Sequence, residues 1–310
     1  MSSGLETDLL LDRRRLKRRL FFWRGFAVAA VLLAAVIAGR GLLPSVGPHV
    51  ARLNISGIIT DDRKLVEAIG DVANDSSAKA LIVAINSPGG SVAGGDSLHA
   101  AIARVAAKKP VVAVMGGTAA SAGYMIAMPA ARVFARESTL TGSIGVLLQT
   151  GEVSGLLAKL GISVETLVSG PLKDQPSLTH PTSEAGRGLL NALVTDMYDQ
   201  FVQIVANGRK MPATRVRELA DGRAYTGRQA LKLGLVDAIG SEPEARAWLQ
   251  AERQVAENLP VRDVERRGLA ERTFGDALGG IFIDAVKNVF SQWLNLDAAQ
   301  ALWQPGTTAR

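Results

Sequence analysis

The fold of this 310-residue chain is decided by the stretch Ala80-Leu81-Ile82-Val83-Ala84-Ile85-Asn86-Ser87-Pro88-Gly89-Gly90-Ser91. An uncharged apolar run leads here directly into a proline–glycine turn. A continuous apolar run bounded by turn residues is typical of a strand that is buried on both faces, as in a parallel sheet. The stretch therefore predicts a buried parallel strand that ends in a tight turn.

A second apolar run, from Val111 to Met115, also leads into small residues, but without a proline–glycine turn. It is followed by the small residues Gly117-Thr118-Ala119-Ala120-Ser121-Ala122-Gly123-Tyr124. We expect a second buried strand, followed by a helix that opens at Ser121 and stops before Pro129. Ser121 is then placed on a strand-to-helix turn.

The rest of the chain alternates in the same way. Strands are expected at 50–59, 132–135, 143–148 and 163–168, and helices at 62–73, 94–107, 153–160, 184–207 and 228–233. This alternation predicts an α/β fold, with helices covering a largely parallel sheet. After it, a charged helix is expected at 244–258. An apolar stripe at 281–294 suits either a contact helix or a helix on a membrane surface.

The N-terminus carries most of the net charge of +6. Residues 1–24 hold seven Lys and Arg against three acids, which accounts for four of the six charges. The remainder is nearly balanced, so no basic face and no nucleic-acid partner are expected. We interpret 1–24 as a cytoplasmic tail, because positive charge stays on the cytoplasmic side of a membrane.

The tail is followed by a largely apolar segment, which we interpret as a transmembrane anchor at residues 25–43. Its charges, Arg24 and Arg40, lie near the ends, where long side chains reach the interface. A cleaved signal peptide is the competing interpretation, since its apolar region is shorter, at ~7–15 residues. Both interpretations place the chain after a linker at 43–49 outside the cytoplasm.

Ser121 and Lys173 are candidates for a nucleophile and its general base. A serine nucleophile needs a base, and a glycine turn such as Gly89-Gly90 supplies backbone N–H donors for acyl transfer. A free lysine has a pKa of ~10.4, and burial lowers it toward the neutral form that accepts a proton. The simpler alternatives are a helix-capping serine and a surface lysine paired with Asp174.

Other chemistries find little support in the composition. The chain has no cysteine and three histidines, His49, His99 and His180, none of which lies between Ser121 and Lys173. A Ser–His–Asp triad is therefore not expected. No metal-ligand spacing and no nucleotide-binding fingerprint is present, so we expect no metal, no cofactor and no use of ATP.

Residues 50–240 resemble the short bacterial form of signal peptide peptidase A, a family of membrane-anchored serine peptidases with a Ser–Lys dyad. The resemblance rests on five blocks that stand in the family's order. They are Asn86–Gly90, Ala120–Tyr124, Thr141–Val146, Ser169–Asp174 and Asp221–Gly227 with its continuation to Asp237. The chain departs from the family at Ala122, where a glycine is frequent, and around Lys173, which Pro171 precedes.

The resemblance implies a role for each site residue. Ser121 is the nucleophile, Lys173 is the base, and Ser143 holds the lysine by a hydrogen bond. The backbone N–H of Gly90 is one oxyanion donor, and that of Ser121 or Ala122 is the other. For Ser143 and Gly90 the alternatives are an ordinary turn or cap.

The resemblance also implies a Clp/crotonase-like fold with an N-terminal transmembrane helix, a peptidase domain at 50–240 and a helical extension at 241–310. The expected substrates are remnant signal peptides and other hydrophobic peptides. The expected setting is the bacterial inner membrane, with the catalytic domain on the periplasmic side and homo-oligomers arranged in a ring. Three alternatives remain open: a quality-control protease for membrane proteins, a catalytically silent membrane scaffold and a crotonase-type acyl-CoA enzyme.

Overall fold

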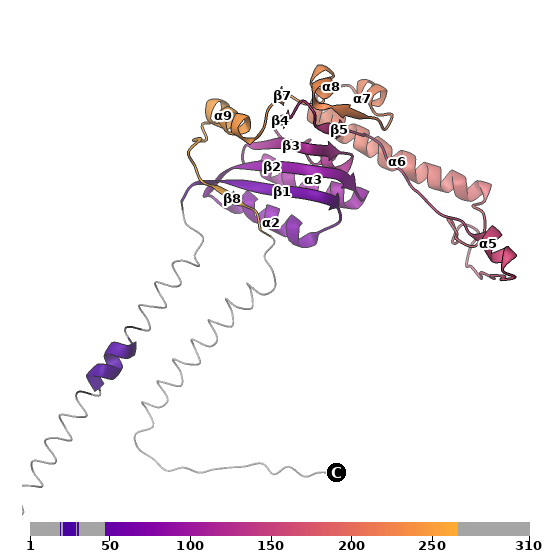
Figure 1. Cartoon of the computed structure of the whole chain (residues 1–310), viewed down its shortest axis with the longest axis horizontal. Coiled ribbons are helices and arrows are strands. Elements are labelled where there is room, and N and C mark those ends of the chain that lie inside the picture. Colours follow the sequence, from indigo (N-terminus) through magenta and orange to yellow (C-terminus); the bar gives the residue numbers. More distant parts are fainter. Residues whose placement is uncertain (1–18, 20, 29, 31–46, 266–310) are drawn as a thin grey trace, which may run out of the picture. The chain divides into compact units, whose positions relative to one another are not determined.

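The computed structural model describes residues 19, 21–28, 30 and 47–265 (Figure 1). The chain divides into two compact units, Met1–Pro48 and His49–Arg310. In the first unit, residues 21–28 are helical and expose Phe21, Phe22, Trp23 and Phe26. Most of the expected anchor at 25–43 and the whole apolar stripe at 281–294 lie outside the described residues. Within the described ranges, no helix has the length and apolar character needed to cross a bilayer.

The second unit is built on one eight-stranded sheet. Its strands are β1 (His49–Ile59), β2 (Ala78–Gly90), β3 (Val111–Ala120), β4 (Arg132–Ala135), β5 (Leu140–Gly142), β6 (Ala224–Thr226), β7 (Ala238–Ile239) and β8 (Val261–Asp263). The main order is β6-β5-β3-β2-β1-β8, and β4 pairs with both β3 and β7. The pairs of this sheet are parallel except for the antiparallel β5–β6 pair. The expected α/β class with a largely parallel sheet is confirmed.

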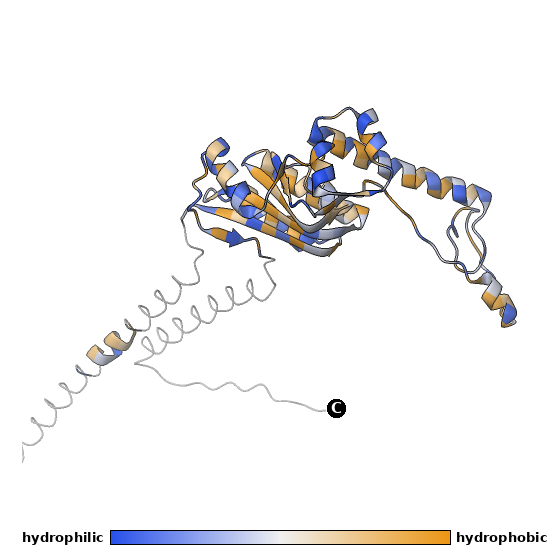
Figure 2. Ribbon diagram, turned by 45° about the horizontal axis from the view of Figure 1, so that its top comes forward, coloured by the Kyte–Doolittle hydropathy of each residue, from blue (hydrophilic) through white to orange (hydrophobic). Residues whose placement is uncertain are grey.

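Helices cover both faces of the sheet (Figure 1). The helices of this unit are α2 (Arg63–Asn74), α3 (Val92–Ala106), α4 (Ala122–Met125), α5 (Ser154–Lys159), α6 (Glu184–Arg209), α7 (Ala213–Leu219), α8 (Gly227–Lys232) and α9 (Glu242–Arg253), of which α5 lies away from the sheet. Leu81, Val83 and Ile85 of β2 pack into the large core with α2, α3 and α4. Ala80 and Ile82 point to the other face, into a smaller core with α9. The strand expected from the opening stretch is therefore buried on both faces, and the hydrophobic colours of Figure 2 lie mainly on these central strands.

Side chains at the helix starts explain where the helices around the sheet begin. Asp62 accepts a hydrogen bond from the Leu65 N–H at 3.1 Å, and Ser91 accepts one from the Gly94 N–H, also at 3.1 Å. Such caps satisfy one of the N–H groups that have no partner inside a helix. Ser91 directly follows the glycine turn, and as the cap it fixes the start of α3 at Val92.

Two expected strands are absent from the structure. Residues 143–148 and 163–168 form neither strand nor helix. Leu147 and Leu167 in these runs are 83% and 90% exposed, so their apolar residues have no sheet to pack on. In contrast, β2 and β3 extend beyond their apolar runs, because the small residues that follow still pair with neighbouring strands.

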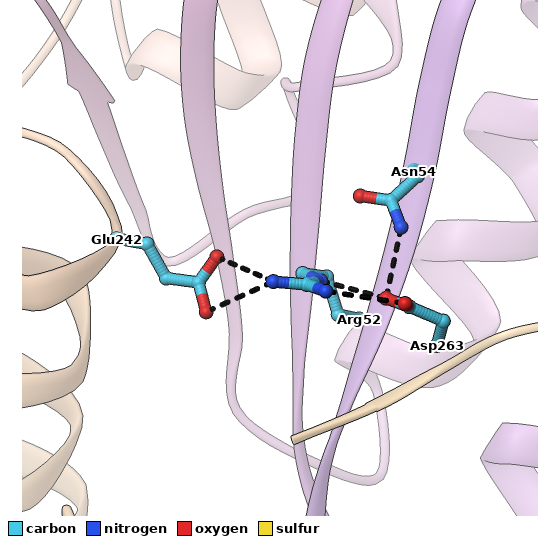
Figure 3. A network of polar contacts seen from close by, with 4 residues as sticks. All are labelled: Arg52, Asn54, Glu242 and Asp263. Atoms are coloured by element: carbon cyan, nitrogen blue, oxygen red, sulfur yellow. Dashed lines mark hydrogen bonds and ion pairs between the residues drawn. The ribbon is translucent and has the colours of Figure 1, made fainter.

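A network of polar contacts holds α9 and β8, in the C-terminal part of the unit, against β1 (Figure 3). Arg52 of β1 donates to Asp263 of β8 at 2.6 and 3.1 Å and to Glu242 of α9 at 3.2 Å. Asn54 donates to the same Asp263 carboxylate at 2.8 Å. The two carboxylates raise the pKa of the Arg52 guanidinium, Asp263 contributing most. These contacts hold β8 and α9 on β1, at a point where the sequence predicted only a polar helix.

The topology brings the ends of four strands to one edge of the sheet. Ile59 of β1 pairs with Gly90 at the end of β2, and Ala120 at the end of β3 pairs with Gly142 at the end of β5. Because these strands are parallel, their carboxyl ends meet at the same edge. In open α/β sheets this edge is where ligands usually bind.

Candidate active site

Ser121 lies on a strained turn between β3 and α4. Its backbone has φ 53° and ψ −123°, a conformation that is costly for a residue with a side chain, at about 1–3 kcal/mol. The Ser121 N–H donates to the Gly142 carbonyl at 2.9 Å, which holds the turn against β5. The side chain makes no helix-capping hydrogen bond, so the capping alternative does not explain this serine. A strained strand-to-helix turn is also how α/β-hydrolases expose a nucleophilic serine.

The glycine turn after β2 lies directly against Ser121. Gly89 has φ +111°, and a β-carbon at this residue would lie 2.8 Å from the Ser121 β-carbon and 3.2 Å from the Ala122 nitrogen. A β-carbon at Gly90 would collide with the backbone of Ile59 on β1. Both positions need glycine because backbone passes close by on each side. The turn therefore lies directly against Ser121 and Ala122 through Gly89.

Ala122 directly follows Ser121 in the chain, and Gly90 directly follows the glycine that packs against it. Ala122 is the first residue of α4, so its N–H has no partner inside its own helix. Helix N-termini favour negative charge for the same reason. The two expected donors thus belong to the two segments that meet at Ser121, and whether their N–H groups bind an oxyanion stays a prediction.

Ser143 follows the residue that holds the Ser121 backbone. It has φ 49°, and its N–H donates to the Arg223 carbonyl at 2.9 Å. Its neighbour Gly142 accepts the Ser121 N–H, so Ser143 lies next to the candidate nucleophile along the β5 edge. Ser143 is thus one residue away from the carbonyl that holds Ser121, and its expected hydrogen bond to Lys173 stays a prediction.

Lys173 is not brought to this site within one chain. It belongs to residues 146–183, a segment that we call the arm, in which Ser177 is the one buried residue. The arm stands at the end of α6 that lies away from the sheet (Figure 1). Lys173 itself is exposed, and within residues 47–265 no hydrogen bond or ion pair joins it to Ser121 or Ser143.

Asp174 on the arm pairs with a histidine and not with the adjacent lysine. The His180 Nε2 atom lies 2.7 Å from the Asp174 carboxylate, and His180 Nδ1 lies 3.3 Å from the Pro181 carbonyl. The Pro181 carbonyl and the Asp174 carboxylate both raise the pKa of His180. The surface-pair alternative for Lys173 and Asp174 is therefore not what the structure shows.

The other two histidines lie at the start of β1 and in the middle of α3. His49 was expected in a linker, but it is buried at the start of β1, with Ser77 at 3.3 Å and Asp75 at 3.7 Å. This amino end of the sheet is opposite the edge that holds Ser121. His99 is partly buried in the middle of α3, and burial lowers its pKa. Within residues 47–265 no hydrogen bond joins a histidine to Ser121.

Two polar residues next to the glycine turn were not predicted from the sequence. The Asn86 side chain accepts the Thr118 N–H at 3.2 Å, and the Ser87 hydroxyl is completely buried. Their signal in the sequence is their place, directly after a buried strand, because polar groups in such a position need hydrogen-bond partners. Within the described residues no cluster of three metal-ligating side chains is found.

Comparison with solved structures adds no argument about function. The structure of 1510-N, a membrane-bound stomatin-specific protease, matches with a TM-score of 0.48 and 18% identity. The match covers 70% of this chain and 97% of that one. At this level of similarity the fold class rests on the sheet topology alone.

Comparison of sequences identifies the family. The model of peptidase family S49 matches residues 103–256. A putative protease of Synechocystis sp. is 40% identical over 64% of this chain and 72% of that protein. A putative signal peptide peptidase SppA of Enterococcus faecium is 35% identical over 67% of this chain and 64% of its own length. The chain therefore belongs to peptidase family S49, as an SppA-like peptidase.

Proposed function

We propose that this protease is a membrane-anchored serine endopeptidase that uses Ser121 as nucleophile and Lys173 as general base. The observation that carries the proposal is Ser121 on its strained turn, with the Gly89-Gly90 turn packed against it. A strained non-glycine backbone beside two candidate oxyanion donors is costly for the fold and useful for acyl transfer. The proposal includes the Clp/crotonase-like form of the α/β fold.

The proposed reaction follows from these positions. The Ser121 oxygen attacks the peptide carbonyl carbon while its proton passes to the neutral Lys173 amine. The N–H groups of Gly90 and Ala122 stabilise the oxyanion, a contribution worth ~10²–10³ in rate for each donor. The C–N bond then breaks, and the leaving amine takes the proton from Lys173. Water attacks the acyl-enzyme by the same route and releases Ser121 with the second product.

We propose that Lys173 reaches Ser121 of a second copy of the chain. The arm exposes large apolar side chains that one chain leaves uncovered. They are Leu147, Leu148, Val153, Leu156, Leu160, Ile162, Val164, Leu167, Val168, Leu172 and Leu178. Monomeric proteins rarely expose an apolar surface of this extent, which favours an interface. Docking on a neighbour would bury the arm and give Lys173 the dry surroundings in which a lysine loses its proton. Head-to-tail contacts of this kind close into rings.

The proposed substrates are remnant signal peptides and other hydrophobic peptides held in a membrane. Phe21, Phe22, Trp23 and Phe26 are exposed beside Arg24, a composition found at membrane interfaces. A membrane tether in front of the peptidase unit raises the effective concentration of substrates in the same membrane. The proposed location is the bacterial inner membrane, with the peptidase unit outside the cytoplasm.

Peptide cleavage by the full chain in detergent tests this function. The substrate is a hydrophobic signal peptide, and the variants are Ser121→Ala and Lys173→Met. Lys159→Met is the matched control, because Lys159 is an exposed lysine of the same arm. We expect both site variants to lose at least ~10³ of the wild-type rate and the control to keep it. Activity that survives in Lys173→Met would remove Lys173 as the base. An inactive but folded wild type would favour the silent scaffold.

A further inference from the structure

Ser87 is a buried hydroxyl in the middle of the site's framework. Its side chain is completely inaccessible, and it belongs to β2, where it pairs with Ala119 of β3. The hydroxyl donates to the Gly57 carbonyl at 2.6 Å and accepts the Gly89 N–H at 3.1 Å. The Gly89 carbonyl is 3.4 Å from the same oxygen, too far to compete with Gly57 for the single proton. One hydroxyl thus joins the end of β1 to the glycine turn.

Both hydrogen bonds constrain the backbone where it packs on Ser121. Gly57 has φ +72° and lies at the irregularity in the β1–β2 pairing, and Gly89 has φ +111°. The helix that follows Ser121 also packs on Ser87, since a β-carbon at Gly123 would lie 3.0 Å from the Ser87 carbonyl oxygen. Ser87 therefore contacts β1, the turn and α4, the three segments whose spacing determines the site.

The hydrogen bond from the Gly89 N–H to Ser87 also determines which backbone N–H of the glycine turn is left for a substrate. Because the Gly89 N–H is held by Ser87, it does not point at a substrate. The next amide along the turn, that of Gly90, is then the one left to face the oxyanion. Without the Ser87 hydroxyl, the Gly89 N–H loses this hydrogen bond, and the turn is held only by its pairing with β1 and its packing on Ser121.

We infer that Ser87 is a positioning residue of the active site: its hydroxyl fixes the Gly89-Gly90 turn so that Gly90 donates to the oxyanion at Ser121. The inference rests on the proposed function. Ser87 does not touch the substrate, and it acts through the two glycines. Rates fall steeply when a donor is misplaced by about 1 Å, so the loss should appear mainly in the transition state.

The test compares three variants of Ser87 in the full chain. Ser87→Ala removes the hydroxyl, Ser87→Cys keeps its size with a much weaker donor and acceptor, and Ser87→Thr keeps the hydroxyl. The matched control is Thr139→Val. Thr139 is equally buried and makes the same pair of bonds, to the Gly116 carbonyl at 2.6 Å and from the Arg136 N–H at 2.9 Å. Thr139→Val thus removes two hydrogen bonds of the same kind as the two that Ser87→Ala removes.

Kinetic, stability and binding measurements separate a positioning role from a role in stability. They are kcat and KM for a signal peptide, the melting temperature, and the affinities for a peptide aldehyde and for the same peptide as an amide. The aldehyde forms a tetrahedral adduct with Ser121 and needs the oxyanion donors, whereas the same peptide as an amide does not. For Ser87→Ala and Ser87→Cys we expect kcat and aldehyde affinity to fall by about 10- to 100-fold. We expect KM and amide affinity to change less than about threefold, and Ser87→Thr to recover most of the rate.

The outcomes are distinct. If Ser87→Ala does not fold, Ser87→Cys decides the question. The inference is overturned if Ser87→Ala or Ser87→Cys matches Thr139→Val in kcat and aldehyde affinity at similar loss of stability. It is also overturned if aldehyde and amide affinities fall together. A folded wild type that neither cleaves peptide nor binds the aldehyde would overturn the proposed function itself, together with this inference.

Discussion

Gly89 and Ser121 are packed so closely that a β-carbon on the glycine would lie 2.8 Å from the β-carbon of the serine. Real β-carbons do not approach each other to this distance. The contact joins two residues 32 positions apart, each with a positive φ, at the carboxyl ends of β2 and β3. The close approach of these two strained backbones is what makes the site.

The first prediction concerns this contact. Gly89→Ala should lower kcat/KM by at least about 100-fold, because either the turn or Ser121 must move. Gly234→Ala is the control, since Gly234 has φ +75° and its β-carbon would meet only the flexible end of Met211. Peptide cleavage and thermal unfolding are measured for both. Equal activity per folded molecule in the two variants would show that the Gly89–Ser121 contact does not matter for catalysis.

The second prediction concerns the origin of the base. If Lys173 serves a neighbouring copy, a mixture of the inactive variants Ser121→Ala and Lys173→Met should regain activity. In randomly mixed rings, about a quarter of the sites combine an intact serine with an intact neighbouring lysine. The chains must be mixed before assembly, and cleavage of the signal peptide is then measured. Activity that stays at the level of the separate variants would mean that the lysine acts within its own chain or is not the base.

The third prediction concerns the arm. The double variant Leu147→Glu, Leu167→Glu replaces side chains that are 83% and 90% exposed. It should abolish both assembly and activity without lowering the melting temperature of the peptidase unit, because it removes apolar contact area between copies and not within one. Analytical ultracentrifugation measures assembly. Thr150→Glu adds a charge to an exposed polar position of the same arm and should preserve assembly.

An intact, active oligomer formed by the double variant would contradict the proposed interface. A folded monomer that keeps full activity would contradict the proposed arrangement in trans.

The fourth prediction concerns the anchoring of α6. Arg209 donates to the Asp237 carboxylate at 2.6 and 2.9 Å and to the Gly234 carbonyl at 2.8 Å, and only 9% of its side chain is exposed. Removing one partner of a buried pair leaves the other charge without compensation. Arg209→Met should therefore cost about 3 kcal/mol in the free energy of unfolding. Arg215→Met breaks an exposed pair with Glu218 and should cost less than about 1 kcal/mol. Urea unfolding tests both, and similar losses would mean that the buried pair is not special.

The fifth prediction concerns pH and the arm. The Pro181 carbonyl and the Asp174 carboxylate raise the pKa of His180, whereas burial lowers the pKa of His99. NMR titration should therefore place His180 above and His99 below the ordinary value of ~6.5. Because folding raises the pKa of His180, the His180–Asp174 pair stabilises the fold fully at a pH below the unfolded pKa of ~6.5. This stabilisation is lost as the pH rises through the folded pKa. Asp174→Asn should lower the pKa of His180 and leave that of His99 unchanged; an unchanged His180 would show that the pair is absent in solution.

The sequence predicted the framework well where local pattern and burial agree. The apolar runs at 80–85 and 111–115 became central strands, and the helix at 184–207 is α6. It failed at 143–148 and 163–168, where an apolar pattern suggested strands that pair with none of the described residues. It also missed β8, whose three residues carry no strand pattern of their own and are held on β1 by Arg52 and Asn54.

The sequence by itself determined the α/β class, the turn that carries Ser121 and the glycines beside it. These depend on local features: apolar runs that favour burial and small residues that permit close turns. Only the tertiary structure decided that the Ser87 hydroxyl holds the Gly89 N–H and that Lys173 stands away on an exposed arm. The physical reason is that both depend on distant partners. A buried hydroxyl is satisfied by whichever backbone folds onto it, and an apolar arm finds its place only where another surface covers it.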